Sequence, residues 1–88
     1  MEYDLYTYDK ELAESVVDLI GRAYVVDGSE RPVLYQFWDI SEDNIRRLAG
    51  HIEEYGEMFE VRNSLSGGYI WPARNSNSLA EILNAQFN

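Results

Sequence analysis

The stretch Asp9–Gly21, DKELAESVVDLIG, decides the fold of this chain. Its apolar residues recur at helical spacing and predict one core-facing stripe, made by Leu12, Val16, Leu19, Ile20 and Ala23. Three acidic residues, Glu11, Glu14 and Asp18, fall on the opposite side. Asp9 suits the N-cap, and Gly21 suits the left-handed position that ends a helix. The stretch therefore predicts an amphipathic helix with an acidic outer face.

The length and composition bound the class of protein. A chain of 88 residues predicts a single domain over residues 1–88. Apolar residues make up 45% and cysteine is absent, so we expect a folded domain without disulfides or a thiolate metal site. The N-terminal sequence MEYDLYTYDK lacks the basic and apolar regions of a secretory signal, and no apolar run is long enough to span a bilayer. We expect a cytoplasmic protein.

Turn and cap signals divide the rest of the chain into strands and helices. Alternating or β-rich runs predict five strands, at Glu2–Tyr8, Arg22–Val26, Val33–Trp38, Met58–Arg62 and Tyr69–Trp71. Ser41 is a good N-cap for a second helix, which Gly56 ends. Ser78 and Glu81 form a capping box that opens a short last helix. The predicted order is therefore βαββαββα.

This order places the chain in the α+β class. Its first six elements follow the split βαβ, or ferredoxin-like, order, in which two helices cover one face of an antiparallel sheet and the other face stays open. The last strand and helix form a C-terminal β-α extension. We expect this extension to cover part of the open face through an apolar side, made by Leu79, Ile82, Leu83 and Phe87.

The residue types that usually carry catalysis form no known pattern here. The single histidine, His51, lies at the border of a predicted helical stripe, and a cysteine-free chain with one histidine offers neither a zinc site nor a serine triad. Carboxylate pairs such as Glu53-Glu54 fall on predicted solvent faces rather than in two unlike environments. Ser66-Gly67-Gly68 lacks the lysine of a phosphate-binding loop. We expect no enzyme activity, no metal and no cofactor.

The charge of the chain is concentrated in one half. The formal net charge is −9, of which residues 1–45 carry −8 and residues 46–88 carry −1. A field of this sign repels nucleic acid and anionic membranes, and it attracts basic protein surfaces. We therefore expect a protein partner with a basic surface, and neither direct binding of nucleic acid nor binding to a membrane.

Aromatic residues are abundant, with seven Tyr, three Phe and two Trp. Tyrosine and tryptophan are the residues that commonly anchor protein interfaces. Six aromatic residues cluster in the first and third strands, which are central neighbours in the predicted sheet: Tyr3, Tyr6, Tyr8, Tyr35, Phe37 and Trp38. Either some of them share the open face as an interface, or they pack under the last helix.

These patterns together predict a non-catalytic inhibitor that occupies a basic nucleic-acid-binding groove of its target. The helical rise separates Glu11 from Glu14 by about 4.5 Å and Glu14 from Asp18 by about 6 Å, comparable with about 3.4 Å between the phosphates of one DNA strand. Nucleic-acid mimics, anti-defence proteins and nuclease immunity proteins share this acidic, tyrosine-rich composition. The expected partner-binding residues are Asp4, Tyr6, Tyr8, Asp9, Glu11, Glu14, Asp18, Asp27 and Tyr35.

Two other interpretations remain open from the sequence. The acidic residues of the first helix can form an ordinary solvated face, which is the usual role of a run of charges. The chain can also be a self-associating ferredoxin-like regulatory module, in which the aromatic sheet face and the apolar side of the last helix bury against a second copy. The second interpretation predicts a salt-resistant homodimer.

Overall fold

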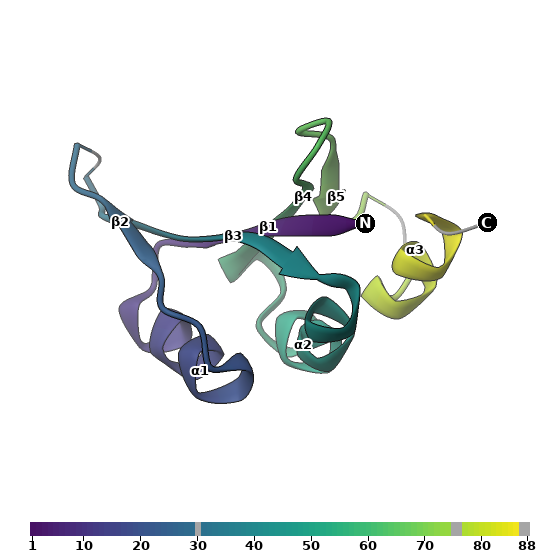
Figure 1. Ribbon diagram of the computed structural model, residues 1–88, viewed down its shortest axis with the longest axis horizontal. Helices are drawn as coiled ribbons and strands as arrows, with labels where there is room; N and C mark the ends of the chain where they lie inside the picture. The colour runs from purple at the N-terminus through teal and green to yellow at the C-terminus, as the bar shows by residue number, and fades with distance from the viewer. Residues whose placement is uncertain (30, 75–76, 87–88) are drawn as a thin grey trace.

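The computed structural model describes residues 1–29, 31–74 and 77–86. They form one five-stranded antiparallel sheet and three α-helices, an α+β fold (Figure 1). The elements in chain order are β1 (Glu2–Thr7), α1 (Lys10–Ile20), β2 (Val25–Asp27), β3 (Leu34–Ser41), α2 (Glu42–Tyr55), the 3-10 turn η1 (Gly56–Met58), β4 (Phe59–Asn63), β5 (Tyr69–Trp71) and α3 (Leu79–Gln86). The predicted sequence of strands and helices is confirmed.

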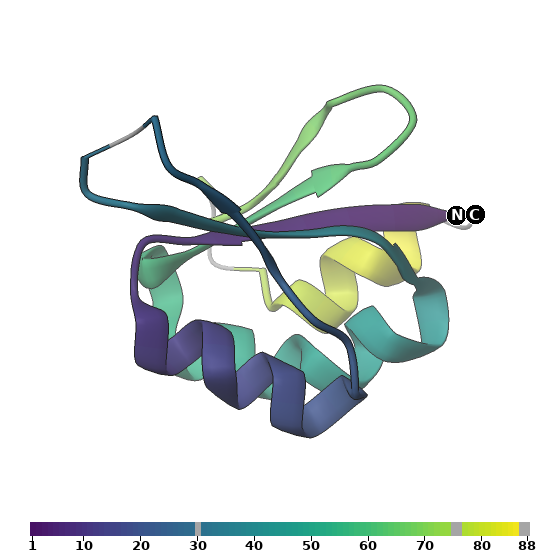
Figure 2. The same cartoon turned by 60° about the vertical axis from the view of Figure 1, so that its left-hand side comes forward.

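The strands lie side by side in the order β2-β3-β1-β4-β5. β1 is central and pairs with both β3 and β4, as the predicted neighbourhood of the first and third strands required. All three helices lie on one side of the sheet, and the β4–β5 hairpin rises on the other side (Figures 1 and 2). We call the side without helices the open face.

The helix ends follow the predicted local chemistry. The carboxylate of Asp9 accepts a hydrogen bond from the backbone amide of Leu12 at 3.0 Å, and Gly21 ends α1 with φ at 69°. Ser41 caps α2 in the same way, at 3.2 Å from the amide of Asn44. These bonds satisfy amide groups that the first turn of a helix otherwise leaves without a partner.

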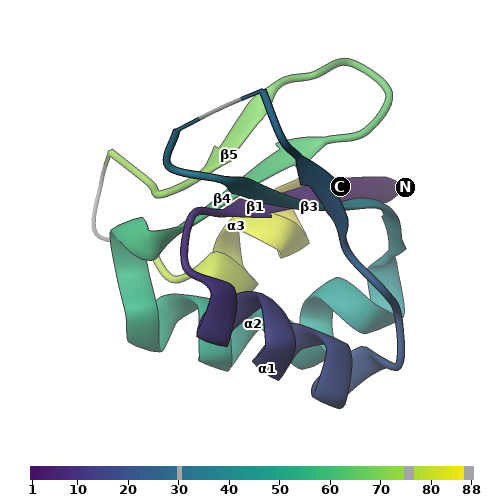
Figure 3. The ribbon, with the colours of Figure 1, turned by 90° about the vertical axis from the view of Figure 1, so that its left-hand side faces the viewer.

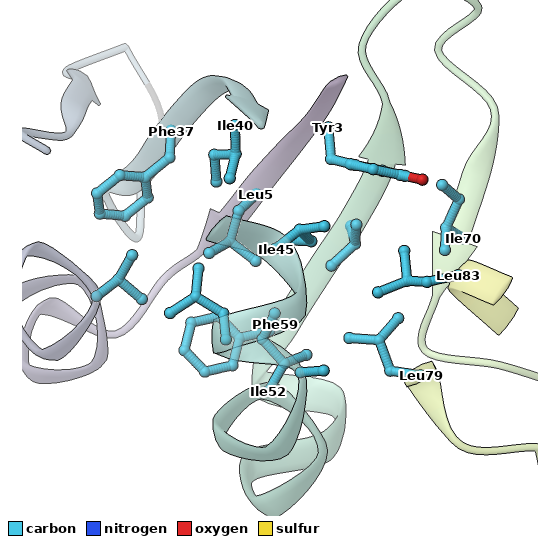
Figure 4. Packing of buried hydrophobic residues seen from close by; sticks show 14 of the residues in the cluster. Tyr3, Leu5, Phe37, Ile40, Ile45, Ile52, Phe59, Ile70, Leu79 and Leu83 are labelled. Atoms are coloured by element: carbon cyan, nitrogen blue, oxygen red, sulfur yellow. The ribbon is translucent and has the colours of Figure 1, made fainter. Parts of the chain in front are cut away.

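The expected position of the last helix is wrong. α3 does not cover the open face; it packs beside α2 on the helical side of the sheet (Figure 3). Leu79 and Leu83 are fully buried and point into the same cluster as Tyr3 and Ile52 (Figure 4). The side chain of Glu53 in α2 accepts a hydrogen bond from the backbone amide of Leu79, which fixes the start of α3 against α2. The expected contribution of Phe87 lies outside the described residues.

The core-facing stripe of α1 is shorter than predicted. Leu12, Ala13 and Val16 are buried, whereas Leu19 is 49% exposed. Ala23 is exposed and lies beyond the helix, because the left-handed backbone at Gly21 ends the helical periodicity two residues earlier. The core is completed from the sheet by strand residues that face the helices, among them Tyr3, Leu5, Phe37 and Phe59 (Figure 4).

Most strand ends differ from the prediction by one to three residues, and one of the two largest differences, at the end of β3, comes from a bulge in that strand. Tyr3 lies opposite Ile40, but Leu5 lies opposite Phe37, so β3 holds one extra residue there. Asp39 takes a left-handed φ of 56° at this point. The bulge returns Ile40 to the core, and β3 therefore continues to Ser41 rather than ending at Trp38.

β2 starts at Val25 rather than at Arg22. Arg22 lies before the strand, and its side chain binds the bulge of β3. Its guanidinium donates hydrogen bonds to the backbone carbonyls of Asp39, at 3.0 Å, and of Trp38, at 2.6 Å. The segment before β2 is therefore held to β3 by a side chain rather than by a backbone ladder.

Candidate functional site

The residues predicted to bind a partner lie on both sides of the sheet. In β1 the side chains of Tyr3, Leu5 and Thr7 face the helices and are buried, so Asp4 and Tyr6 belong to the open face. Asp27 lies opposite Leu34 at the edge of the same sheet. Glu11, Glu14 and Asp18 are exposed on α1, which lies under the other side of the sheet (Figure 1). The structure therefore does not bring Asp4 and Asp27 beside the acidic helix.

The three carboxylates of α1 form one surface, which we call the acidic row: Glu11, Glu14 and Asp18. At about 100° per residue they lie within a sector of about 60°, opposite the buried Val16. None of them forms an ion pair with another described residue. The acidic row thus presents three uncompensated negative charges to solvent along one side of the helix.

Three other predicted acidic residues bond to nearby parts of the chain. Asp9 caps α1, as described above. Asp27 accepts hydrogen bonds from the hydroxyl of Ser29 at 2.6 Å and from its amide at 3.0 Å, and these bonds lower the pKa of the Asp27 carboxyl below its ordinary value. Asp4 accepts from the amide of Asp39 at 3.0 Å and from the hydroxyl of Ser64. All three therefore serve turns, caps or the bulge as well as adding negative charge.

The aromatic residues divide between the core and the open face. Tyr3 and Phe37 are fully buried. Tyr35 lies opposite Thr7, which places it on the helical side, and its half-buried ring packs edge-on against Tyr24 with ring centroids 5.1 Å apart. Tyr35 therefore does not join the other predicted tyrosines. Trp38, at the bulge, is 46% exposed.

The open face carries a groove of 690 Å³ where β1 ends and β4 begins. Three tyrosines from three different segments line it, together with charged residues of both signs. We call this site the tyrosine groove and define it by Tyr6, Tyr8, Glu57, Met58, Glu60, Arg62, Tyr69 and Arg74. A cavity of this size, with aromatic walls and a few polar groups, has the dimensions of a ligand site.

The sequence reasoning missed six residues of the tyrosine groove: Glu57, Met58, Glu60, Arg62, Tyr69 and Arg74. The alternation of β4 places Glu60 and Arg62 on one face, which is a readable signal. The register is not readable, because it depends on pairing that puts Tyr6 opposite Glu60 and Arg62 opposite Tyr69. The groove is thus a product of the sheet order.

Within the tyrosine groove, one arginine contacts both a carboxylate and an aromatic ring. The guanidinium of Arg62 bonds to Glu60, with Nε 2.6 Å from Oε2, and lies 5.9 Å from the ring centroid of Tyr69. The hydrogen bond to Glu60 and its negative charge raise the pKa of Arg62 further above its ordinary value. Burial, followed by the charge of Asp4, raises the pKa of Tyr6. Both groups therefore keep their protons at neutral pH.

Ser15 and His51 meet between α1 and α2, with Oγ 2.7 Å from Nε2. The Ser15 hydroxyl donates to the carbonyl of Leu12 at 2.6 Å, so the His51 ring nitrogen is the donor in the contact with Ser15. An activated serine needs the opposite direction, with the histidine accepting the hydroxyl proton. The pair thus joins the two helices, and His51 is the boundary residue that its sequence position indicated.

The described part of the chain contains neither a cluster of metal ligands nor a membrane-spanning helix. No group of three or more histidine, aspartate or glutamate side chains among those residues is arranged to hold a metal ion. Within the same part of the chain, no helix combines the length and the apolar character that crossing a bilayer requires.

Comparison with known proteins adds no functional assignment. No protein-family model, no curated protein and no solved structure matches this chain. The acidic row and the tyrosine groove, on opposite sides of the sheet, are the two surfaces from which a function can be inferred.

Proposed function

We propose that this chain is a non-catalytic inhibitor that binds a basic nucleic-acid-binding surface of a partner protein through the acidic row. The observation that carries the proposal is the arrangement of Glu11, Glu14 and Asp18: exposed, on one side of α1 and without an ion-pair partner in the described part of the chain. Regularly spaced, uncompensated carboxylates suit a surface that has evolved to hold phosphates.

The wider charge distribution supports the same class of partner. α2 lies beside α1 under the sheet (Figure 1) and exposes a further carboxylate, Glu54. The net charge of −9 speeds the encounter with a basic surface and opposes direct binding to nucleic acid. Nucleases and defence proteins offer such surfaces, so an immunity or anti-defence role fits. A chain without cysteine that meets such a partner fits the cytoplasm.

We propose the ferredoxin-like fold as the framework for this surface. The order β1-α1-β2-β3-α2-β4 and the spatial order β2-β3-β1-β4 of an antiparallel sheet support it. β5 and α3 are then an extension at the β4 edge. In this framework α1 crosses beneath the sheet from the end of β1 to β2, which turns its outer side to solvent.

Affinity capture with charge-matched variants tests the proposed function. The row variant, Glu11→Gln, Glu14→Gln and Asp18→Asn, removes three charges from α1. The matched control, Glu2→Gln, Asp43→Asn and Glu81→Gln, removes three exposed charges elsewhere. The tagged wild type and the control are expected to retain the same nucleic-acid-binding protein from a lysate at low salt, and the row variant is expected to lose it.

The retained protein must also be released by competing duplex DNA or RNA and by moderate salt, because the proposal assigns it a nucleic-acid-binding surface. Equal retention by the wild type and the row variant would exclude the acidic row as the binding surface. Retention that nucleic acid does not compete away would exclude mimicry of a phosphate row.

Self-association is the second candidate function, but the burial of the apolar side of α3 weakens the argument for it. It required an apolar side of α3 to be available for a second copy, but Leu79 and Leu83 are fully buried and Ile82 is partly buried against the same core. What favours it is the exposure of Trp38 and Tyr69 on the sheet. Light scattering separates the candidates, since a homodimer through these rings would resist salt and a partner-free inhibitor would remain a monomer.

A further inference from the structure

We propose that the tyrosine groove receives an arginine side chain from an exposed segment of a basic partner protein. The class of partner rests on the proposed function, but the site does not, because the groove and the acidic row are formed by different residues. The observation that carries the inference is that the groove already holds one guanidinium and presents the elements needed for a second.

Arg62 shows how this groove binds a guanidinium group. Its guanidinium lies 5.9 Å from the ring centroid of Tyr69 and bonds to the carboxylate of Glu60 at 2.6 Å. An aromatic ring together with a carboxylate is the combination that holds a planar cation, because the ring face attracts the charge and the carboxylate accepts the N–H groups.

A second ring and a second carboxylate stand in the same groove. Tyr8 is 55% exposed and Glu57 is exposed, and Glu57 forms no ion pair with any residue that the structure describes. Met58, the last residue of η1, also lines the groove, is 48% exposed and offers an apolar surface for the aliphatic part of the incoming side chain. An arginine inserted here bonds to Glu57 and lies against the Tyr8 ring, as Arg62 lies against Tyr69.

The charged residues of the groove predict whether each substitution raises or lowers the affinity for a cation. Glu60 already compensates Arg62, whereas Arg74, which also lines the groove, has no ion-pair partner among the described residues. Arg74 therefore opposes an incoming cation, and its removal strengthens binding. A groove built for an anion would behave in the opposite way, losing affinity without Arg74 and gaining it without Glu57.

Titration of the full-length 15N-labelled protein with an acetylated, amidated tetra-arginine peptide tests the proposal by NMR. Saturable amide shifts are expected at Tyr8, Glu57, Met58 and Tyr69, and they persist in the row variant defined above. Glu57→Gln is expected to weaken binding at these amides about fivefold, and Arg74→Gln to strengthen it about twofold. The matched control Glu2→Gln, on the same strand face at the far end of β1, changes it by less than about twofold.

A tetra-citrulline peptide, which keeps the shape of arginine without its charge, is expected to give no saturable shifts in the groove. The proposal is overturned if the arginine peptide shifts only amides of α1, if Glu57→Gln behaves like Glu2→Gln, or if Arg74→Gln weakens binding. Failure of the proposed function is a separate result: partner capture that ignores the acidic row excludes that function and leaves arginine binding in the groove intact.

Discussion

The hydroxyl of Thr7 donates a hydrogen bond to the backbone carbonyl oxygen of Met58 at 2.8 Å. The same hydroxyl accepts one from the backbone amide of Asp9 at 3.1 Å. Thr7 is 2% exposed and joins the end of β1 to η1 and to the N-cap of α1. One buried hydroxyl therefore holds a wall of the tyrosine groove and the first turn of the acidic helix at the same end of the molecule.

Thr7→Val is expected to lower the free energy of unfolding by about 1 kcal/mol, because it keeps the shape but leaves the part-buried carbonyl of Met58 and the amide of Asp9 without this partner. Urea unfolding measures it. Thr7→Ser is the control, since it keeps both hydrogen bonds and loses one methyl group, worth about 0.8 kcal/mol. A valine variant as stable as the wild type would show that the hydroxyl bonds contribute nothing net.

Asp39 provides a second stability test, which measures the cost of its backbone conformation rather than of a side-chain contact. Its φ of 56° is a conformation that L-residues adopt at a cost of about 1 kcal/mol or more and that glycine adopts freely. Asp39→Gly is therefore expected to be more stable than Asp39→Ala by about 1 kcal/mol in urea unfolding. Both variants lose the Asp39 carboxylate, which lies 2.7 Å from the Ser64 hydroxyl, so their difference isolates the backbone. Equal stabilities would mean that the bulge relaxes to another conformation in the alanine variant.

Stability at high pH follows from the two perturbed tyrosines in β1. Burial, followed by the charge of Glu42, raises the pKa of Tyr3 above 10.0, and burial with Asp4 raises that of Tyr6. The folded protein holds these phenol protons more tightly than the unfolded chain, so their contribution is complete below pH 10 and is lost as the pH rises through the raised values. The wild type is expected to lose stability between about pH 9 and about pH 11.5.

The double variant Tyr3→Phe and Tyr6→Phe removes both protons and is expected to lose less stability over the same interval, measured by urea unfolding at the two pH values. Phenylalanine keeps the ring packing, so the comparison concerns ionisation. An identical loss in the wild type and the double variant would assign the alkaline instability to other groups.

The helix ends could be predicted because their signals are local. A cap residue bonds to an amide three positions away, as Asp9 does to Leu12 and Ser41 does to Asn44. The bulge in β3 could not be predicted in this way. It is held by Arg22 on the carbonyls of the bulge and by Asp4 on the amide of Asp39, which are contacts across 16 to 35 positions of the chain.

The sequence predicted which acidic residues share one side of α1, but not on which face of the sheet the aromatic residues lie. The carboxylates of α1 share one side because helical spacing fixes them, so the acidic row could be predicted. The aromatic residues could not be assigned, because the face of each strand residue depends on register. Thr7 opposite Tyr35 sends that ring to the helical side. Arg62 opposite Tyr69 places a guanidinium beside a ring of the neighbouring strand, which only the pairing of β4 with β5 determines.

Glu14 offers a test of the acidic row in the isolated protein. It lies three residues from Glu11 and four from Asp18, spacings at which like charges on a helix repel one another. Glu14→Gln removes both repulsions, together with the weaker attraction to Lys10 four residues earlier, and is expected to raise the free energy of unfolding by about 0.3 kcal/mol at low salt. In about 1 M NaCl, where charges are screened beyond roughly 3 Å, the gain should disappear.

Glu81→Gln is the matched control, because Glu81 has no acidic residue at these spacings and lies in the first turn of α3, where a negative charge is favourable. It is expected to lower the stability slightly, opposite in sign to Glu14→Gln. If the carboxylates of the acidic row repel one another in the free protein, a basic surface that neutralises them relieves this repulsion. The relief adds to the free energy of binding, which favours a binding role over a merely solvated helix face. If Glu14→Gln gave no gain at low salt, the three carboxylates would not repel one another, and this electrostatic contribution to binding would be absent.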